Sequence, residues 1–196
     1  MGFGMRRSSK QQAAHKFKRG VTLVELMVVI AIVAIMAAVA VPAMSQFIND
    51  LRVSNATNEF VNALNEARSE AIKSGRLVTV CRSTDAGTAA TPSCSNGGDW
   101  SVGWLVFIES SSTTNVRTFE AGEVILARHG ALSTNIAASL TGLGNVITFN
   151  STGEPSGVGS FGINFNYNGH CARQITMSRA GRVKVTPDAI PPTQCN

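Results

Sequence analysis

Apolar and polar positions divide the chain into an apolar stretch near its start, an amphipathic stretch and a series of short β-rich runs. Residues 26–41 are sixteen consecutive positions without a charge or a side-chain hydrogen-bonding group. Counted over residues 21–43, the apolar stretch is long enough to cross roughly 30 Å of hydrocarbon as a helix. The pattern therefore predicts a membrane-spanning helix over residues 21–43.

The helical pattern continues beyond the apolar stretch. One apolar face follows the spacing i, i+4, i+7 and i+11, and its members are Phe60, Leu64, Ala67 and Ala71. Ser74 and Gly75 then supply the small residue and the glycine that commonly end a helix. We expect one helix from about Thr22 to Lys73, whose amphipathic part, residues 44–74, packs on a globular domain.

After Gly75 the pattern changes to short β-branched and aromatic runs separated by turns. The expected strands are residues 77–81, 104–108, 124–128, 146–150, 162–166, 173–178 and 182–186. Three segments rich in Gly, Ser, Thr or Asn are expected to be exposed loops, namely residues 85–98, 110–115 and 151–160. A long helix followed by strands predicts an α+β fold, in which the helix packs on an antiparallel sheet domain over residues 75–196.

The net charge of +5 is due to an excess of cations at the start of the chain. Six Lys and Arg and no acid lie in residues 1–20, so residues 21–196 hold eleven cations against all 12 acids. Six cations precede the apolar stretch and only Arg52 follows it closely, which predicts a cytoplasmic N-terminus and a domain outside the inner membrane, in the periplasm of a bacterium. The histidines are scattered and no Cys-x-x-Cys occurs, so we expect neither a metal nor a cofactor.

Glu25 is a lone carboxylate at the start of the apolar stretch. A carboxylate costs a few kcal/mol at the centre of a bilayer, which makes it a functional candidate. Cleavage of the chain after Gly20 would create an ammonium group on Val21, about one helical turn from Glu25. In the alternative interpretation, Glu25 lies at the membrane interface and is favoured there by the dipole of the helix N-terminus.

The start of the chain resembles the class III signal of type IV prepilins and type II secretion pseudopilins. The residues that carry the resemblance are Gly20, Val21, Thr22, Leu23, Glu25 and Pro42. It implies that a prepilin peptidase removes the leader, residues 1–20, by cutting between Gly20 and Val21, and that the new amine of Val21 is methylated. It also implies that Glu25, Thr22 and Pro42 serve filament assembly.

The distal half of the chain carries a second resemblance. It resembles the GspH/FimT family of minor pseudopilins and minor pilins. It rests on the segments 100–107, 147–150 and 175–185, which include Trp100, Trp104 and the run Gly181-Arg182-Val183-Lys184. It implies a type IV pilin-like fold and a minor subunit that helps to initiate or cap a type IV pilus or a type II secretion pseudopilus. Its implied partners are major and minor pilins or pseudopilins, the prepilin peptidase, the inner-membrane assembly platform and the membrane itself. Plain core packing is the alternative role of the two tryptophans.

The four cysteines agree with an oxidising compartment, where disulfides persist. Cys81 and Cys94 bracket a loop rich in Ser, Thr, Gly and Pro, while Cys171 and Cys195 bracket the last segment. Of the three possible connectivities, we favour Cys81 with Cys94 and Cys171 with Cys195.

DNA binding is a second function hypothesis, because some members of this family bind DNA during its uptake through cations near the C-terminus. The corresponding residues are Arg173, Arg179, Arg182 and Lys184. On a strand, Arg182 and Lys184 would share a face and meet successive phosphates. The alternative is a solvated hairpin whose charges keep a sheet edge soluble. The sequence has no nucleophile elbow and no Walker lysine, so we expect no enzymatic activity.

Overall fold

The computed structural model describes residues 20–96, 99–110, 119–120, 122–141, 146–156, 161–167 and 170–187. Two compact units make up the chain, Met1–Met44 and Ser45–Asn196. Residues 1–19 of the expected leader and Cys195 lie outside the described residues, as do the side chains of Pro42 and Cys171.

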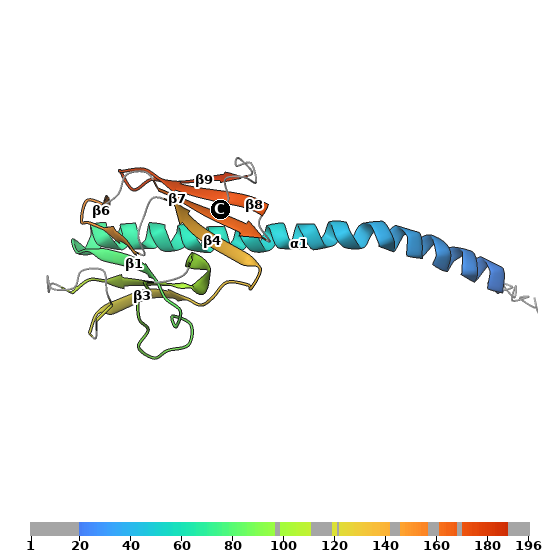
Figure 1. Ribbon diagram of the computed structural model, residues 1–196, viewed down its shortest axis with the longest axis horizontal. Helices are drawn as coiled ribbons and strands as arrows, with labels where there is room; N and C mark the ends of the chain where they lie inside the picture. The colour runs from blue at the N-terminus through green and yellow to red at the C-terminus, as the bar shows by residue number, and fades with distance from the viewer. Residues whose placement is uncertain are drawn as a thin grey trace, which may run out of the picture. The chain divides into compact units, whose positions relative to one another are not determined.

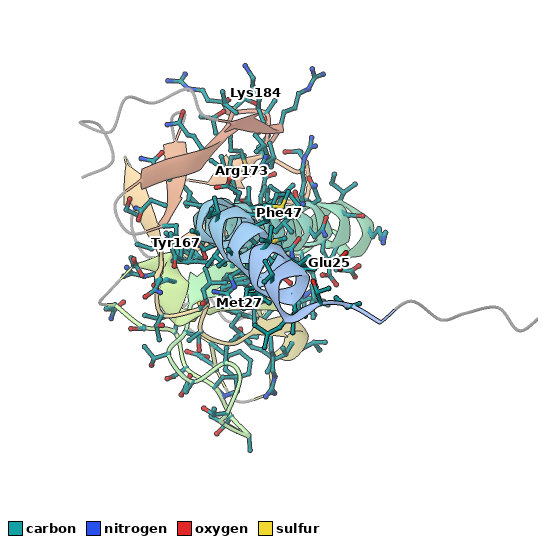
Figure 2. The ribbon with its side chains drawn as sticks, turned by 90° about the vertical axis from the view of Figure 1, so that its right-hand side faces the viewer. Glu25, Met27, Phe47, Tyr167, Arg173 and Lys184 are labelled. Carbon is teal, nitrogen blue, oxygen red and sulfur yellow. A yellow bond between two sulfur atoms is a disulfide. The ribbon has the colours of Figure 1, made fainter. Side chains whose placement is uncertain are left out.

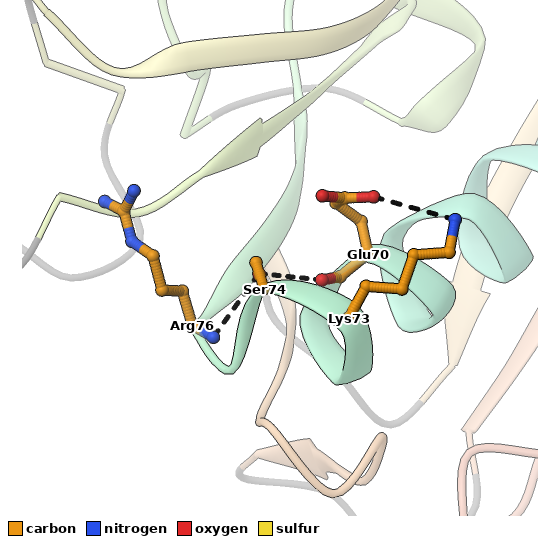
Figure 3. Close-up of polar contacts among 4 residues, drawn as sticks. All are labelled: Glu70, Lys73, Ser74 and Arg76. Atoms are coloured by element: carbon orange, nitrogen blue, oxygen red, sulfur yellow. Dashed lines mark hydrogen bonds and ion pairs between the residues drawn. The ribbon is translucent and has the colours of Figure 1, made fainter.

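Helix α1 runs over Leu23–Ser74, within one residue of the predicted bounds at both ends. At its C-terminus, the Ser74 hydroxyl donates to the carbonyl of Glu70 at 2.7 Å, and the Lys73 ammonium lies 3.9 Å from the Glu70 carboxylate (Figure 3). Gly75 follows with φ of 67°, and its N–H donates to the carbonyl of Ala71 at 3.0 Å. A residue without Cβ adopts this left-handed conformation at low cost, so the helix ends where the sequence predicts.

The strands form two antiparallel sheets instead of the single sheet expected. One has the order β3-β2-β1-β5-β6 and comprises β1 (Val78–Arg82), β2 (Trp104–Ile108), β3 (Val124–His129), β5 (Val146–Phe149) and β6 (Pro155–Ser156). The other has the order β4-β7-β8-β9 and comprises β4 (Ile136–Thr141), β7 (Phe161–Tyr167), β8 (His170–Met177) and β9 (Val183–Pro187). The C-terminal part of α1 lies between the two sheets (Figure 1).

All seven predicted strands are present, but β4 and β6 were not predicted. The two-residue β6 lies inside the expected loop 151–160. Strand β4 contains Ala137, Ala138 and Ser139, whose small side chains give a weak strand signal. Its outer edge is covered by Asp99, which accepts the N–H of Ala138 at 3.2 Å and that of Ser101 at 3.0 Å. Asp99 thereby also caps the short 3₁₀ helix η1 (Trp100–Val102).

The core forms where the predicted apolar face of α1 meets both sheets. Phe60, Leu64, Ala67 and Ala71 are all fully buried, as the spacing predicts. The ring of Phe60 lies 5.1 Å from that of Trp100, 5.0 Å from that of Trp104 and 6.0 Å from that of Phe165. Trp100 and Trp104 are 1% and 2% exposed, which supports core packing as their role. Aromatic edge-to-face contacts of this kind add to the free energy of area burial.

A disulfide joins Cys81 to Cys94, confirming one of the two favoured pairings. It lies on the face of the five-stranded sheet opposite the main core, next to the buried side chains of Leu105 and Phe107. The loop it closes is tied to β3, because the Arg128 guanidinium donates to the carbonyl of Ala89 at 3.0 Å. The second favoured pairing, Cys171 with Cys195, lies outside the described residues.

Asp85 organises the disulfide loop. Its carboxylate accepts the N–H of Ser93 at 2.9 Å and the hydroxyls of Ser93 and Ser83 at 3.0 and 2.8 Å. The Ser93 N–H has the largest effect on the pKa of Asp85, and together with the hydroxyls it holds this pKa below its ordinary value of 3.8. Partial desolvation opposes the shift without cancelling it. The charged form of Asp85 is therefore the form that the loop stabilises.

We predict that the Asp85 contribution to folding is lost in acid. Because the pKa is lower in the folded chain than in the unfolded one, the contribution is complete above the ordinary value and disappears as pH falls through the lowered value. The free energy of unfolding of Asp85→Asn should therefore lie below that of the wild type at pH 6 and approach it at pH 3. Urea titrations at both pH values measure this, with Asp50→Asn, an exposed acid on α1, as control. A difference between Asp85→Asn and wild type that is equal at pH 6 and pH 3 contradicts the prediction.

Candidate functional site

The expected cleavage site lies at the start of the described chain. Gly20 and Val21 are exposed, Val21 to 71%, and no atom of the surroundings lies within 4 Å of a Cβ built at Gly20. Thr22 caps α1, since its hydroxyl accepts the N–H of Glu25 at 3.2 Å and its carbonyl accepts the N–H of Leu26 at 3.1 Å. The helix therefore begins directly after the expected cut, with Glu25 in its first turn.

Apolar side chains cover the first part of α1 on all sides. Leu23 is 74% exposed, Ile30 59% and Ile35 70%, and other large apolar side chains between them are more than half exposed. A helix that is apolar all round is stable only when a membrane or other apolar helices surround it. Other apolar groups must therefore surround this surface, and the described part of the chain does not supply them.

No helix among the described residues is long and apolar enough to cross a membrane. The side chains of Val39, Pro42 and Ala43, which belong to the expected span over residues 21–43, lie outside the described residues.

In the second unit, the exposed apolar surface extends to Leu51. Phe47, Ile48 and Leu51 are 58%, 40% and 47% exposed, whereas Val53 is fully buried. The buried face of α1 thus begins at Val53, whereas Phe47, Ile48 and Leu51 present apolar side chains without a described partner.

The cationic hairpin is the second surface of interest, and we define it as residues 178–185, which form the turn after β8 and the first part of β9. Arg179, Arg182 and Lys184 are all exposed, and Lys184 points away from the body of the domain (Figure 2). Val183 and Val185, its neighbours on β9, are partly buried against the core, as the alternation predicts.

Arg173 does not join the cationic hairpin. In the register it is paired with Phe165 and Pro187, at the end of β8 away from the turn. It also alternates in phase with the buried Ile175 and Met177, so it belongs to the helix-facing side of the sheet. The structure thus groups three of the four candidate cations and separates the fourth.

The charges of the hairpin are not neutralised within the described residues. An ion pair there joins Lys73 to Glu70, and a 2.7 Å hydrogen bond joins His129 to Glu59, and neither involves a cation of the hairpin. The hydrogen bond between His129 and Glu59 links the end of β3 to α1, while the His129 ring stacks on Trp104 of β2 with ring centroids 4.0 Å apart. The two partners lie 70 residues apart in the chain, so no local sequence pattern indicates this contact.

No cluster of three or more potential metal ligands occurs among the described residues. The candidate functional features of the described residues are the apolar surface of α1, the carboxylate of Glu25 and the cationic hairpin.

Family models and solved structures of known proteins are similar to this chain. The family model of the type II transport protein GspH matches residues 56–181, and that of the prokaryotic N-terminal methylation motif matches residues 15–41. Two crystal structures of the type IV minor pilin FimU of Pseudomonas aeruginosa PAO1 have a similar fold, each at 20% identity, with TM-scores of 0.53 and 0.52. They cover 73% and 74% of this chain and 99% and 95% of their own. The minor pseudopilin EpsH of the Vibrio cholerae type 2 secretion system matches at 13% identity, with a TM-score of 0.48 over 71% of this chain and 99% of its own.

The GspH match spans more than half of the chain and includes α1 from Ala56 onward, strands β1 to β8 and the first part of the turn of the cationic hairpin. It confirms the family that the distal motifs predict, and the methylation motif covers Gly20, Val21 and Glu25. The chain belongs to the GspH family of minor pseudopilins and minor pilins.

Proposed function

We propose that this chain is a minor filament subunit that helps to initiate or cap a type IV pilus or a type II secretion pseudopilus. The observation that carries the proposal is the apolar surface of α1, which begins directly after the expected cleavage site and extends to Leu51. Such a surface is covered equally well by lipid or by the helices of other subunits. The same helix can therefore be stored in the inner membrane and then be bundled in a filament.

In this proposal, prepilin peptidase cuts between Gly20 and Val21, and the new amine of Val21 is methylated. The inner membrane holds residues 21–43, with the leader cytoplasmic and the globular domain periplasmic, until the assembly platform adds the subunit to a filament. Glu25 then pairs with a terminal amine, its own or that of a neighbour, which compensates a carboxylate in apolar surroundings. Thr22 supports this step by starting the helix at the cleavage site.

In-cell crosslinking tests the proposal and identifies the system. A C-terminally tagged chain is crosslinked, and partners are identified by mass spectrometry in inner-membrane and sheared-surface fractions. We expect recovery with other pilins or pseudopilins, and a tagged Glu25→Val chain serves as the control for assembly-dependent partners. Capture of a major type IV pilin assigns the subunit to a pilus, and capture of secretion pseudopilins assigns it to protein export. Recovery of neither class contradicts the proposal.

A second candidate function is binding of DNA by the cationic hairpin. It is favoured by the exposure of Arg179, Arg182 and Lys184 on one hairpin and by the absence of an ion-pair partner for them among the described residues. Cations arranged in this way bind phosphates without sequence preference, and salt weakens the binding.

We predict that Arg182→Ala combined with Lys184→Ala weakens DNA binding and lowers its salt dependence. Loss of two phosphate contacts should reduce the slope of log K against log salt by roughly 1.8. The measurement is a fluorescence titration of a labelled duplex with the full chain in detergent at several salt concentrations. Arg52→Ala with Lys73→Ala removes the same charge from α1 and should leave the slope unchanged. Equal binding by the hairpin variant and wild type, or no binding by wild type at low salt, rejects this function.

A further inference from the structure

Arg68 of α1 joins two turns that belong to different sheets. Its Nε donates to the carbonyl of Gly153 at 3.0 Å, and its Nη2 donates to the carbonyl of Ala180 at 3.0 Å. Gly153 lies in the turn between β5 and β6 of the five-stranded sheet, and Ala180 lies in the turn between β8 and β9 of the four-stranded sheet. One guanidinium thus holds the tip of the cationic hairpin against the opposite sheet.

The two turns are packed too closely for side chains. Gly153 and Gly181 have φ values of 77° and 72°, which favour glycine. A Cβ at Gly181 would overlap the carbonyl oxygen of Gly153, and a Cβ at Gly153 would lie 2.7 Å from Cδ1 of Ile72. The backbones therefore touch directly, and Arg68 closes the contact from the side of the helix.

Each turn also has internal hydrogen bonds that keep its carbonyl aimed at Arg68. The N–H of Glu154, in the same peptide group as the Gly153 carbonyl, donates to Oδ1 of Asn150 at 2.9 Å. The N–H of Gly181, in the same peptide group as the Ala180 carbonyl, donates to the carbonyl of Ser178 at 2.9 Å. Both acceptors of Arg68 are thereby fixed before any ligand arrives. The cations Arg179 and Arg182 directly flank Ala180 and Gly181, the two residues of the turn that lie against Arg68 and Gly153.

We propose that Arg68 is a positioning residue for the cationic hairpin, which holds Arg179, Arg182 and Lys184 as a fixed array for a polyanion such as DNA. We call the contact of Arg68 with the two turns at Gly153 and Gly181 the latch. The choice of ligand rests on the second candidate function, whereas the latch itself is argued from its hydrogen bonds and the close packing of the two turns. Arginine is required because its planar fork reaches two carbonyls in fixed directions, whereas a lysine ammonium is a single flexible point. Fixing the array in advance removes an ordering cost from binding.

The test compares Arg68→Lys and Arg68→Met with Arg52→Met in the full chain in detergent. Arg52 is exposed on the same helix, so Arg52→Met removes the same charge without touching the latch. Hydrogen exchange of peptides that cover residues 150–154 and 178–182 reports the latch, and titration of a labelled duplex over a range of salt concentrations reports binding. We expect both Arg68 variants to exchange faster in both peptides and to bind DNA roughly five- to tenfold more weakly, with the salt slope of the wild type.

Three outcomes of these measurements would contradict parts of the proposal. Hydrogen exchange of the two turns that is the same in Arg68→Met as in Arg52→Met overturns the latch. A salt slope that falls by about 0.9 in Arg68→Met shows that Arg68 contacts a phosphate itself and overturns its role as a positioning residue. Absence of DNA binding by wild type at low salt rejects the second candidate function and with it the polyanion ligand, and the exchange data still decide the latch.

Discussion

Glu25→Val is expected to be processed normally and yet to be missing from filaments. The carboxylate of Glu25 lies in the first turn of α1, in a part of the helix that is otherwise apolar, one turn from the amine that the proposed cleavage would create at Val21. In the proposed filament the two charges would lie in apolar surroundings, where removing one partner of an ion pair costs about 3–5 kcal/mol. The Val21 ammonium would then be buried without compensation. We expect the share of processed subunit in the sheared fraction to fall at least tenfold, since roughly 1.4 kcal/mol corresponds to a factor of ten.

Immunoblots of whole cells and of sheared filaments measure the two steps separately. Glu25→Gln keeps the length of the side chain and a hydrogen-bonding group without the charge, so it distinguishes charge from shape and should also fail. Gly20→Leu places a bulky residue at the cut and should give an unprocessed precursor, which marks the position of that species on the gel. Entry of Glu25→Val into filaments at the level of wild type would refute the pairing of Glu25 with a terminal amine.

The sequence predicts the helix well because its signals are local. Thr22, the apolar run and Gly75 define the two ends, and the spacing from Phe60 to Ala71 defines the buried face. The alternation on β9 likewise predicts that Val183 packs inward and Lys184 outward. Each of these signals depends on neighbours within one or a few turns of the chain.

The division into two sheets depends instead on contacts between distant residues. Strand β4 has only a weak strand signal in its sequence, and in the structure β7 pairs with one of its edges while Asp99 accepts a backbone N–H at the other. In the sequence, Arg68 is an ordinary polar position on a helix. The two carbonyl groups that accept its hydrogen bonds lie 85 and 112 residues away in the chain. Nothing near Arg68 in the sequence indicates these partners, so the latch at the cationic hairpin becomes visible only in the folded chain.

Phe60→Ala is expected to give the largest loss of stability. The Phe60 ring is fully buried and touches the rings of Trp100, Trp104 and Phe165, which come from η1 and from both sheets. Replacing such a ring with a methyl group costs about 3–5 kcal/mol through lost burial and the cavity left behind. Because one side chain joins the helix to both sheets, we expect little relaxation into the cavity and a value near the upper end of this range.

Urea unfolding of the full chain in detergent, followed by tryptophan fluorescence, measures this loss. Trp100 and Trp104 are the chain's 2 tryptophans, and both contact Phe60, so the probe reports the affected region directly. Phe47→Ala removes the same ring from a position on the same helix that is 58% exposed, and it should change the free energy of unfolding by less than about 0.5 kcal/mol. If Phe60→Ala lost no more stability than Phe47→Ala, the aromatic cluster would not be what joins the helix to the two sheets.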